Sequence, residues 1–90
     1  MNILQTRTFK NSVKRLHNNQ KKVLDNAIKE IINNPLIGEQ KKGDLANLRV
    51  YKFHMVGQLT LLAYSFNDNT VTLTLISFGS HENFYRDLKH

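Results

Sequence analysis

The stretch that decides the fold runs from LRVYKFHM (48–55) through VG to QLTLLAYSF (58–66), and through NDN to TVTLTLISF (70–78). Each of the three longer segments is rich in β-branched and aromatic residues, which is typical of strands. Gly57 and residues 67–69 suit reversals of the chain, so we expect an antiparallel meander of three strands. QLTLLAYSF is largely apolar on both faces and is therefore expected to be the central strand.

The residues before the meander predict a pair of helices. Apolar side chains recur at helical spacing from residue 9 to 16 and again from 23 to 32. The triplet HNN at 17–19 interrupts this pattern with residues that favour turns and caps. NNP at 33–35 ends it, because the residue before a proline is pushed out of the helical region. Residues 8–34 are thus predicted to form a helical hairpin.

Shorter segments complete the fold. Residues 2–5 are expected to be a short strand, 35–47 a connection, and HENFYRDLK (81–89) a last short helix capped by Ser80, with Gly79 ending the sheet. The order is then strand, two helices, three strands and helix. This order predicts one α+β domain over residues 1–90, in which the helical hairpin packs on one face of the meander.

The positive charge is concentrated at one end of the chain. The net charge is +6, with thirteen Lys and Arg against seven Asp and Glu. Residues 1–22 hold six bases and no acid, so the other 68 residues sum to zero. A field of this kind favours a polyanion, either nucleic acid or an acidic protein, although a solvated basic face is the alternative. The six candidate binding residues are Arg7, Lys10, Lys14, Arg15, Lys21 and Lys22.

Several classes of chemistry have no support in the sequence. There is no cysteine, which excludes disulfides, thiolate metal sites and cysteine nucleophiles. The four histidines lack metal-ligand spacing, and neither a phosphate loop nor a GxSxG motif occurs. No apolar run approaches the roughly 20 residues of a membrane helix, and the start has no secretory apolar region. We therefore expect a cytoplasmic protein without metal, cofactor or membrane contact.

Histidine, tyrosine, arginine and lysine remain, and this set suffices for RNA cleavage without a metal, where the 2′-hydroxyl of the substrate is the nucleophile. His81 and Tyr85 are four apart, on one face of the predicted last helix. Arg49 lies on one face of its strand, and Lys52 and His54 on the other. Arg49 therefore reaches a common site with Lys52 and His54 only if a bulge intervenes in this strand. The alternative is that His81 is a polar residue of a first helical turn and Tyr85 an aromatic at the core edge.

Three stretches, GDLANLRVYKF, QLTLLAY and LTLISFGSHENFY, resemble the RelE/ParE superfamily of bacterial type II toxins. The resemblance extends over essentially the whole chain, in size and in the order of elements. The ending is similar to that of YafQ-type toxins, in which a Gly-x-His turn precedes an aromatic residue. In this chain the matching residues are Gly79, His81 and Tyr85.

The resemblance implies a ribosome-dependent mRNA endonuclease that is neutralised by a cognate acidic antitoxin and needs no cofactor. It implies proton transfer by His81 and Tyr85, and phosphate contacts from Arg49 and, as a further candidate, Lys52. His54 is a looser match to the same set. The basic first quarter would then face ribosomal RNA or the antitoxin.

The chain also departs from the family pattern. It lacks the Asp-Trp pair of YafQ-like toxins, and QLTLLAYSF lacks the arginine of RelE-like toxins. Two alternatives therefore stay open: a ParE-like inhibitor of DNA gyrase, and a non-enzymatic basic module that binds nucleic acid. An endonuclease should arrest translation, a gyrase poison should break DNA, and a plain binding module should do neither.

Overall fold

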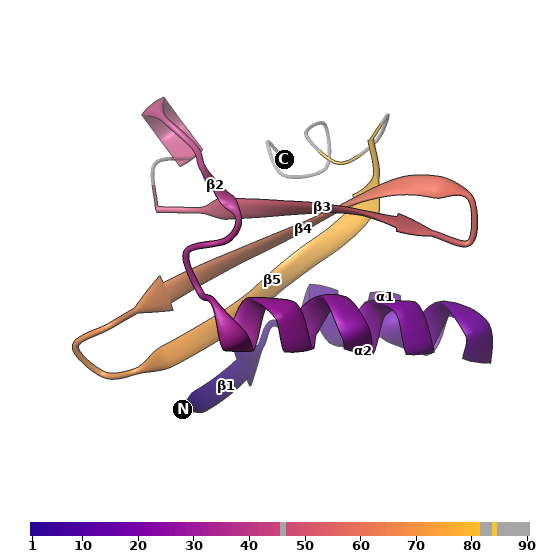
Figure 1. Ribbon diagram of the computed structural model, residues 1–90, viewed down its shortest axis with the longest axis horizontal. Coiled ribbons are helices and arrows are strands. Elements are labelled where there is room, and N and C mark those ends of the chain that lie inside the picture. The colour runs from indigo at the N-terminus through magenta and orange to yellow at the C-terminus, as the bar shows by residue number, and fades with distance from the viewer. Residues whose placement is uncertain (46, 82–83, 85–90) are drawn as a thin grey trace.

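In the part of the chain that the structure describes, five strands form one sheet, and two helices pack on one of its faces (Figure 1). The computed structural model describes residues 1–45, 47–81 and 84. A single 3-10 turn, Gly43–Leu45, precedes the third strand. The elements are β1 (Asn2–Gln5), α1 (Arg7–Lys14), α2 (Asn18–Asn33), β2 (Glu39–Gln40), β3 (Arg49–Met55), β4 (Gln58–Asn67) and β5 (Thr72–Ser80).

The sheet confirms the predicted meander and its predicted centre. Its strand order is β1-β5-β4-β3-β2, with β3, β4 and β5 antiparallel and β1 parallel to β5. The central strand β4 has neighbours on both sides, and residues 61–64 within it have no exposed surface. The sheet is therefore mixed, and the α+β class predicted from the sequence is confirmed.

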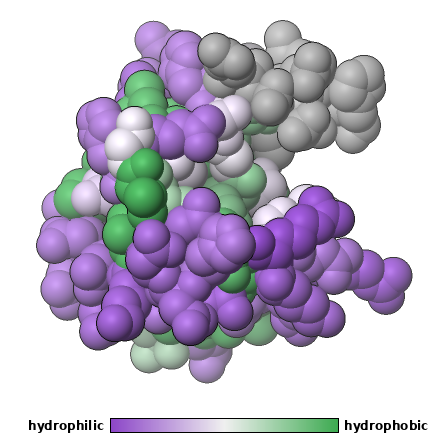
Figure 2. Space-filling view, turned by 90° about the vertical axis from the view of Figure 1, so that its right-hand side faces the viewer, coloured by the Kyte–Doolittle hydropathy of each residue, from purple (hydrophilic) through white to green (hydrophobic). Residues whose placement is uncertain are grey.

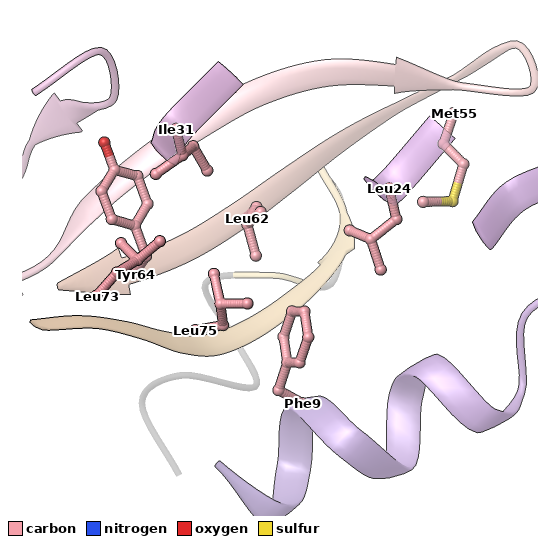
Figure 3. Close-up of a cluster of buried hydrophobic side chains, with 8 residues drawn as sticks. All are labelled: Phe9, Leu24, Ile31, Met55, Leu62, Tyr64, Leu73 and Leu75. Atoms are coloured by element: carbon pink, nitrogen blue, oxygen red, sulfur yellow. The ribbon is translucent and has the colours of Figure 1, made fainter. Parts of the chain in front are cut away.

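Both helices place their apolar stripes on the sheet. Phe9 of α1 and Leu24 and Ile31 of α2 are buried in one cluster with side chains of β3, β4 and β5 (Figure 3). Thr6 fixes the start of α1: its hydroxyl accepts from the Phe9 amide at 3.1 Å and donates to the Ile76 carbonyl of β5. This contact ties the first helical turn to the sheet.

The other face of the sheet is turned away from α1 and α2, and we call it the outer face. Here Val50 of β3 and Leu61 and Ala63 of β4 form a second buried cluster with Phe84, and Ile76 packs against it. Phe84 is 2% exposed. One part of the outer face is thus covered by a residue from the end of the chain.

Three details of the sequence prediction need correction or lie largely outside the described residues. Gly79 does not end the sheet, because β5 continues through it to Ser80. The connection 35–47 contains the short strand β2 and the 3-10 turn. Of the predicted last helix at 81–89, His81 lies in a turn and Phe84 is helical, and the other seven residues lie outside the described part of the chain, so this helix stays a prediction. No helix in the described part of the chain is long and apolar enough to span a membrane.

Candidate functional site

A β-bulge in β5 decides where the end of this strand points. Ser77 pairs with Ala63 and Leu75 pairs with Tyr64, so Ile76 is an extra residue without a partner in β4. Counting by twos from the buried residues Leu73 and Leu75 would place residue 81 on the helix side. The extra residue reverses the alternation, and residues 77, 79 and 81 follow the outer face instead.

His54 and His81 flank the same residue on the outer face. His54 of β3 lies opposite Leu59 of β4, and the His81 amide donates to the Leu59 carbonyl at 3.2 Å. Two inter-strand spacings separate the backbones of the two histidines by about 10 Å. Both histidines are exposed. The sheet register thus places two predicted site residues from different strands in one cross-strand row.

A second row lies next to the first. Lys52 pairs with Leu61, and Leu61 pairs with Gly79. These three residues lie on the same face as the histidine row, two residues further along each strand. Lys52 is exposed. A Cβ atom added to Gly79 would have no described atom within 4 Å. Gly79 therefore leaves bare backbone beside the histidine row, as at sites where a ligand approaches a strand closely.

We call Lys52, His54, Leu59, Gly79 and His81 the outer-face site. A hollow of about 270 Å³ opens at its end and is lined by Gln58, Leu59, Ser80 and His81. No three His, Asp or Glu side chains gather into a metal-binding group within residues 1–45, 47–81 and 84. The residue types of the site suit proton transfer and the stabilisation of a phosphate charge.

Arg49 does not join this site. It lies opposite Tyr64, on the helix side of the sheet, and its Nη1 atom donates to the carbonyls of Leu36 at 3.2 Å and Gly38 at 2.8 Å. The expected role of Arg49 on a scissile phosphate stays a prediction. Its contacts indicate instead that it positions the loop after α2.

Tyr64 holds the same loop from inside the core. Its hydroxyl donates to the Pro35 carbonyl and accepts from the Gly38 amide, both at 2.8 Å. Burial raises the pKa of the Tyr64 phenol above 10.0, although the Gly38 hydrogen bond and the charge of Arg49 oppose the shift. The phenol therefore keeps its proton at neutral pH and remains a donor to Pro35.

The six basic residues of the first quarter all lie in or beside the helices, across the sheet from the outer-face site. Figure 2 looks onto the end with the β3–β4 turn, and hydrophilic side chains fill most of its lower half, at the height of the helices in Figure 1. Lys21 is half-buried, and the exposed members are Arg7, Lys10, Lys14, Arg15 and Lys22.

The sequence matches a known protein family. A model of the ParE-like toxins of type II bacterial toxin-antitoxin systems matches residues 3–89. The chain belongs to this toxin family. No curated protein matches its sequence.

Solved structures agree with the fold of the toxin. The toxin resembles the Escherichia coli RelBE toxin-antitoxin complex with a TM-score of 0.71 and 19% identity over 88% of its own chain and 94% of the other. For the RelBE complex of Mycobacterium tuberculosis the TM-score is 0.74, with 17% identity over 89% and 96%. For isolated Escherichia coli RelE it is 0.70, with 19% identity over 98% and 95%.

The structure of the toxin brings together three of the five predicted catalytic residues, Lys52, His54 and His81. Tyr85 lies outside the described residues. The sequence indicated Gly79 only as the glycine of a Gly-x-His turn and not as a site residue, although the bulge that places it on the outer face leaves a trace. The helix-side apolar residues of β5 are Leu73, Leu75 and Phe78, so their spacing changes from two to three at the bulge.

Proposed function

We propose that the toxin is a metal-independent endonuclease that cleaves mRNA on the ribosome, and that the outer-face site carries the reaction. The observation that supports this most directly is the row in which His54 and His81 flank Leu59. Imidazole exchanges protons near neutral pH more readily than any other side chain. Two imidazoles on either side of one position can therefore serve as base and acid for a single phosphodiester.

The reaction balances without any further reactant. One histidine takes the proton of the 2′-hydroxyl as its oxygen attacks phosphorus, and the bond from phosphorus to the 5′-oxygen breaks. The other histidine protonates that leaving oxygen. The products are a 2′,3′-cyclic phosphate and a 5′-hydroxyl end. Either histidine can take either role in this geometry.

Two further needs of the reaction are a positive charge near the phosphate and room for the RNA backbone, and we assign them to Lys52 and Gly79. The Lys52 ammonium, one step along the same face, is placed to stabilise the additional negative charge of the phosphorane. Bare backbone at Gly79 allows the ribose-phosphate chain to lie against β5. Tyr85 is proposed as a further proton-transfer group, on the strength of the family resemblance alone.

The partners follow from the charge distribution and the relatives. RelBE structures are toxin-antitoxin complexes, and we propose that this toxin likewise has a cognate acidic antitoxin. The basic helical layer, across the sheet from the site, suits either that antitoxin or ribosomal RNA. Changing Lys10, Lys14, Lys21 and Lys22 to glutamine should weaken binding to whichever partner uses this surface and reduce its salt dependence.

The deciding experiment measures three outputs of the purified toxin in a cell-free translation system. Sequencing of mRNA ends detects cleavage, end chemistry tests for the cyclic phosphate, and a supercoiled plasmid with gyrase reports DNA breaks. We expect cleaved mRNA with 5′-hydroxyl ends and an intact plasmid. His54→Ala and His81→Ala should each slow cleavage by about 10²-fold or more, as general acid-base groups do.

The controls separate chemistry from folding. Lys52→Gln should slow cleavage, whereas Lys42→Gln, which changes an exposed lysine of the loop before β3, should not. All four variants should keep the thermal midpoint of the wild type, because these side chains are exposed. Broken plasmid with intact mRNA would identify a gyrase inhibitor, and neither product would identify a plain binding module.

A further inference from the structure

A second recess lies at the opposite end of the sheet. It has a volume of about 530 Å³ and lies between the loop after α2, the start of β3 and the β4–β5 turn. Arg49 and His54 are five residues apart on β3, which places the recess about 17 Å from the histidine row. Its polar and aromatic lining includes Asn34, Asn47, Arg49, Phe66 and Asp68.

The guanidinium of Arg49 lines the recess and is held in place by the backbone. The two protons of Nη1 are used by the Leu36 and Gly38 carbonyls. Its Nε and Nη2 atoms have no hydrogen-bond or ion-pair partner in the described part of the chain. Together these two atoms form one edge that can donate two parallel hydrogen bonds to a ligand. Because the carbonyls already hold the guanidinium, little side-chain entropy is lost on binding.

Asp68 restricts what this edge can bind. Its exposed carboxylate lines the same recess, and within residues 1–45, 47–81 and 84 it forms no ion pair with Arg49. A simple anion would be repelled by Asp68, and a simple cation by Arg49. The ligand that suits both presents two acceptors on one edge and donors on another. Phe66 adds an aromatic surface to the same wall.

Guanine has this arrangement of groups. Its O6 and N7 atoms accept two hydrogen bonds from an arginine, and its N1–H and amino group can donate to a carboxylate. Adenine offers N7 as an acceptor but has a donor at the neighbouring position, and the pyrimidines lack the O6 and N7 pair. An aromatic ring stacks on any base, so Phe66 contributes affinity and the two charged residues contribute the choice of base.

We propose that this recess binds a guanine base through Arg49 and Asp68, with Phe66 as the stacking surface. The volume lies within the range of small-ligand pockets. The guanine can belong to a free nucleotide or to single-stranded RNA, because both present the same edges. The assignment does not depend on cleavage at the outer-face site, since the two places share no residue.

NMR titration of the full-length, isotope-labelled toxin tests the assignment. The probes are GMP, IMP, which lacks the amino group, and AMP. We expect GMP to shift amide signals around residues 34, 47–49 and 66–68, with at least tenfold tighter binding than AMP and with IMP between them. Asp68→Asn should reduce GMP affinity about tenfold and remove the preference over AMP. The matched control, Asp25→Asn on the exposed side of α2, should bind GMP as the wild type does.

A further arm distinguishes the two sources of guanine. A five-nucleotide RNA of uridines with one central guanosine is compared with the all-uridine RNA and with GMP. Tighter binding of the guanosine-containing RNA than of GMP assigns the recess to RNA, and tighter binding of GMP assigns it to a free nucleotide. Equal affinity for GMP and AMP, shifts confined to other residues, or a preference unchanged by Asp68→Asn would overturn the proposal.

Discussion

The two ends of strands β3 and β4 differ in how firmly their polar groups are held. At the end with Arg49 and Tyr64, side chains make four hydrogen bonds to the backbone of one loop, at 2.8 to 3.2 Å. At the other end His54 and His81 are exposed, and the backbone register aligns them. The same two strands therefore stabilise the fold at one end and present reactive groups at the other.

The glycines of the two ends show the same contrast. A Cβ atom on Gly38 would lie 2.7 Å from the Tyr64 hydroxyl oxygen, in a buried position. One on Gly79 would have no described atom within 4 Å. Gly38 is small because the folded chain leaves no space there, whereas no residue within 1–45, 47–81 and 84 imposes such a constraint at Gly79. The described residues thus leave space at Gly79, where we propose that the RNA backbone lies.

We call the end with His54 and His81 the open end, and the end with Arg49 and Tyr64 the fixed end. The largest expected effect is on activity, at the open end. Gly79→Val places a branched side chain beside the histidine row, where we propose that the ribose-phosphate chain lies. We expect mRNA cleavage to fall at least 100-fold, about 2.7 kcal/mol in transition-state stabilisation. The free energy of unfolding should change by less than about 0.5 kcal/mol. Cleavage assays and urea unfolding measure both quantities, and full activity in this variant would contradict the proposed path of the RNA.

The next effect is on stability, at the fixed end. Gly38→Ala forces Tyr64, which has no exposed surface, or the loop to move. We expect a loss of about 2 kcal/mol, as for other overpacked cores. The measurement is urea unfolding, with Gly79→Ala as the matched glycine-to-alanine control, expected within about 0.5 kcal/mol of the wild type. Equal losses in both variants would show that the two ends are equally constrained.

A smaller effect is expected when only the hydroxyl is removed. Tyr64→Phe leaves the buried Gly38 amide without its partner, which costs about 1–2 kcal/mol. In the unfolded chain Tyr64 loses its proton near pH 10, whereas the folded protein keeps it because the folded pKa is raised. Wild-type stability from this group is therefore present below pH 10 and lost as pH rises above it. The stability difference between wild type and variant should shrink between pH 8 and pH 10.5, and a constant difference would contradict the raised pKa.

The fold was largely predictable because its signals are local. Helical spacing in residues 9–32 and the interruptions at Gly57 and 67–69 are read from neighbouring residues, and α1, α2 and the three long strands agree with them. The pairing of β1 with β5 brings together residues about 70 positions apart. Hydropathy patterns within short windows do not contain such information.

The candidate site was less predictable, because it depends on a register shift. Arg49 and Lys52 were both predicted from the family resemblance as phosphate contacts, although strand alternation, readable from the sequence, places them on opposite faces. His81 reaches the face of Lys52 through the extra residue Ile76. To locate that shift, one must know which residue of β4 pairs with each residue of β5. A single sequence indicates the shift only through the changed spacing of apolar residues between Leu75 and Phe78.

The smallest expected effect concerns one strained valine at each end. Val56 in the β3–β4 turn and Val71 before β5 have φ angles of 49° and 50°, and they are 58% and 47% exposed. A left-handed conformation costs a branched residue about 1 kcal/mol, whereas asparagine adopts it readily. Val56→Asn also creates an Asn-Gly pair with Gly57, which suits a two-residue hairpin turn. We expect it to raise the free energy of unfolding by about 1 kcal/mol in urea titrations.

Val71→Asn is the matched variant at the fixed end, and a similar gain there would show that this strain is a local property of each turn. A loss of stability at Val56 alone would mean that its exposed side chain packs against the open end, which would break the contrast between the two ends.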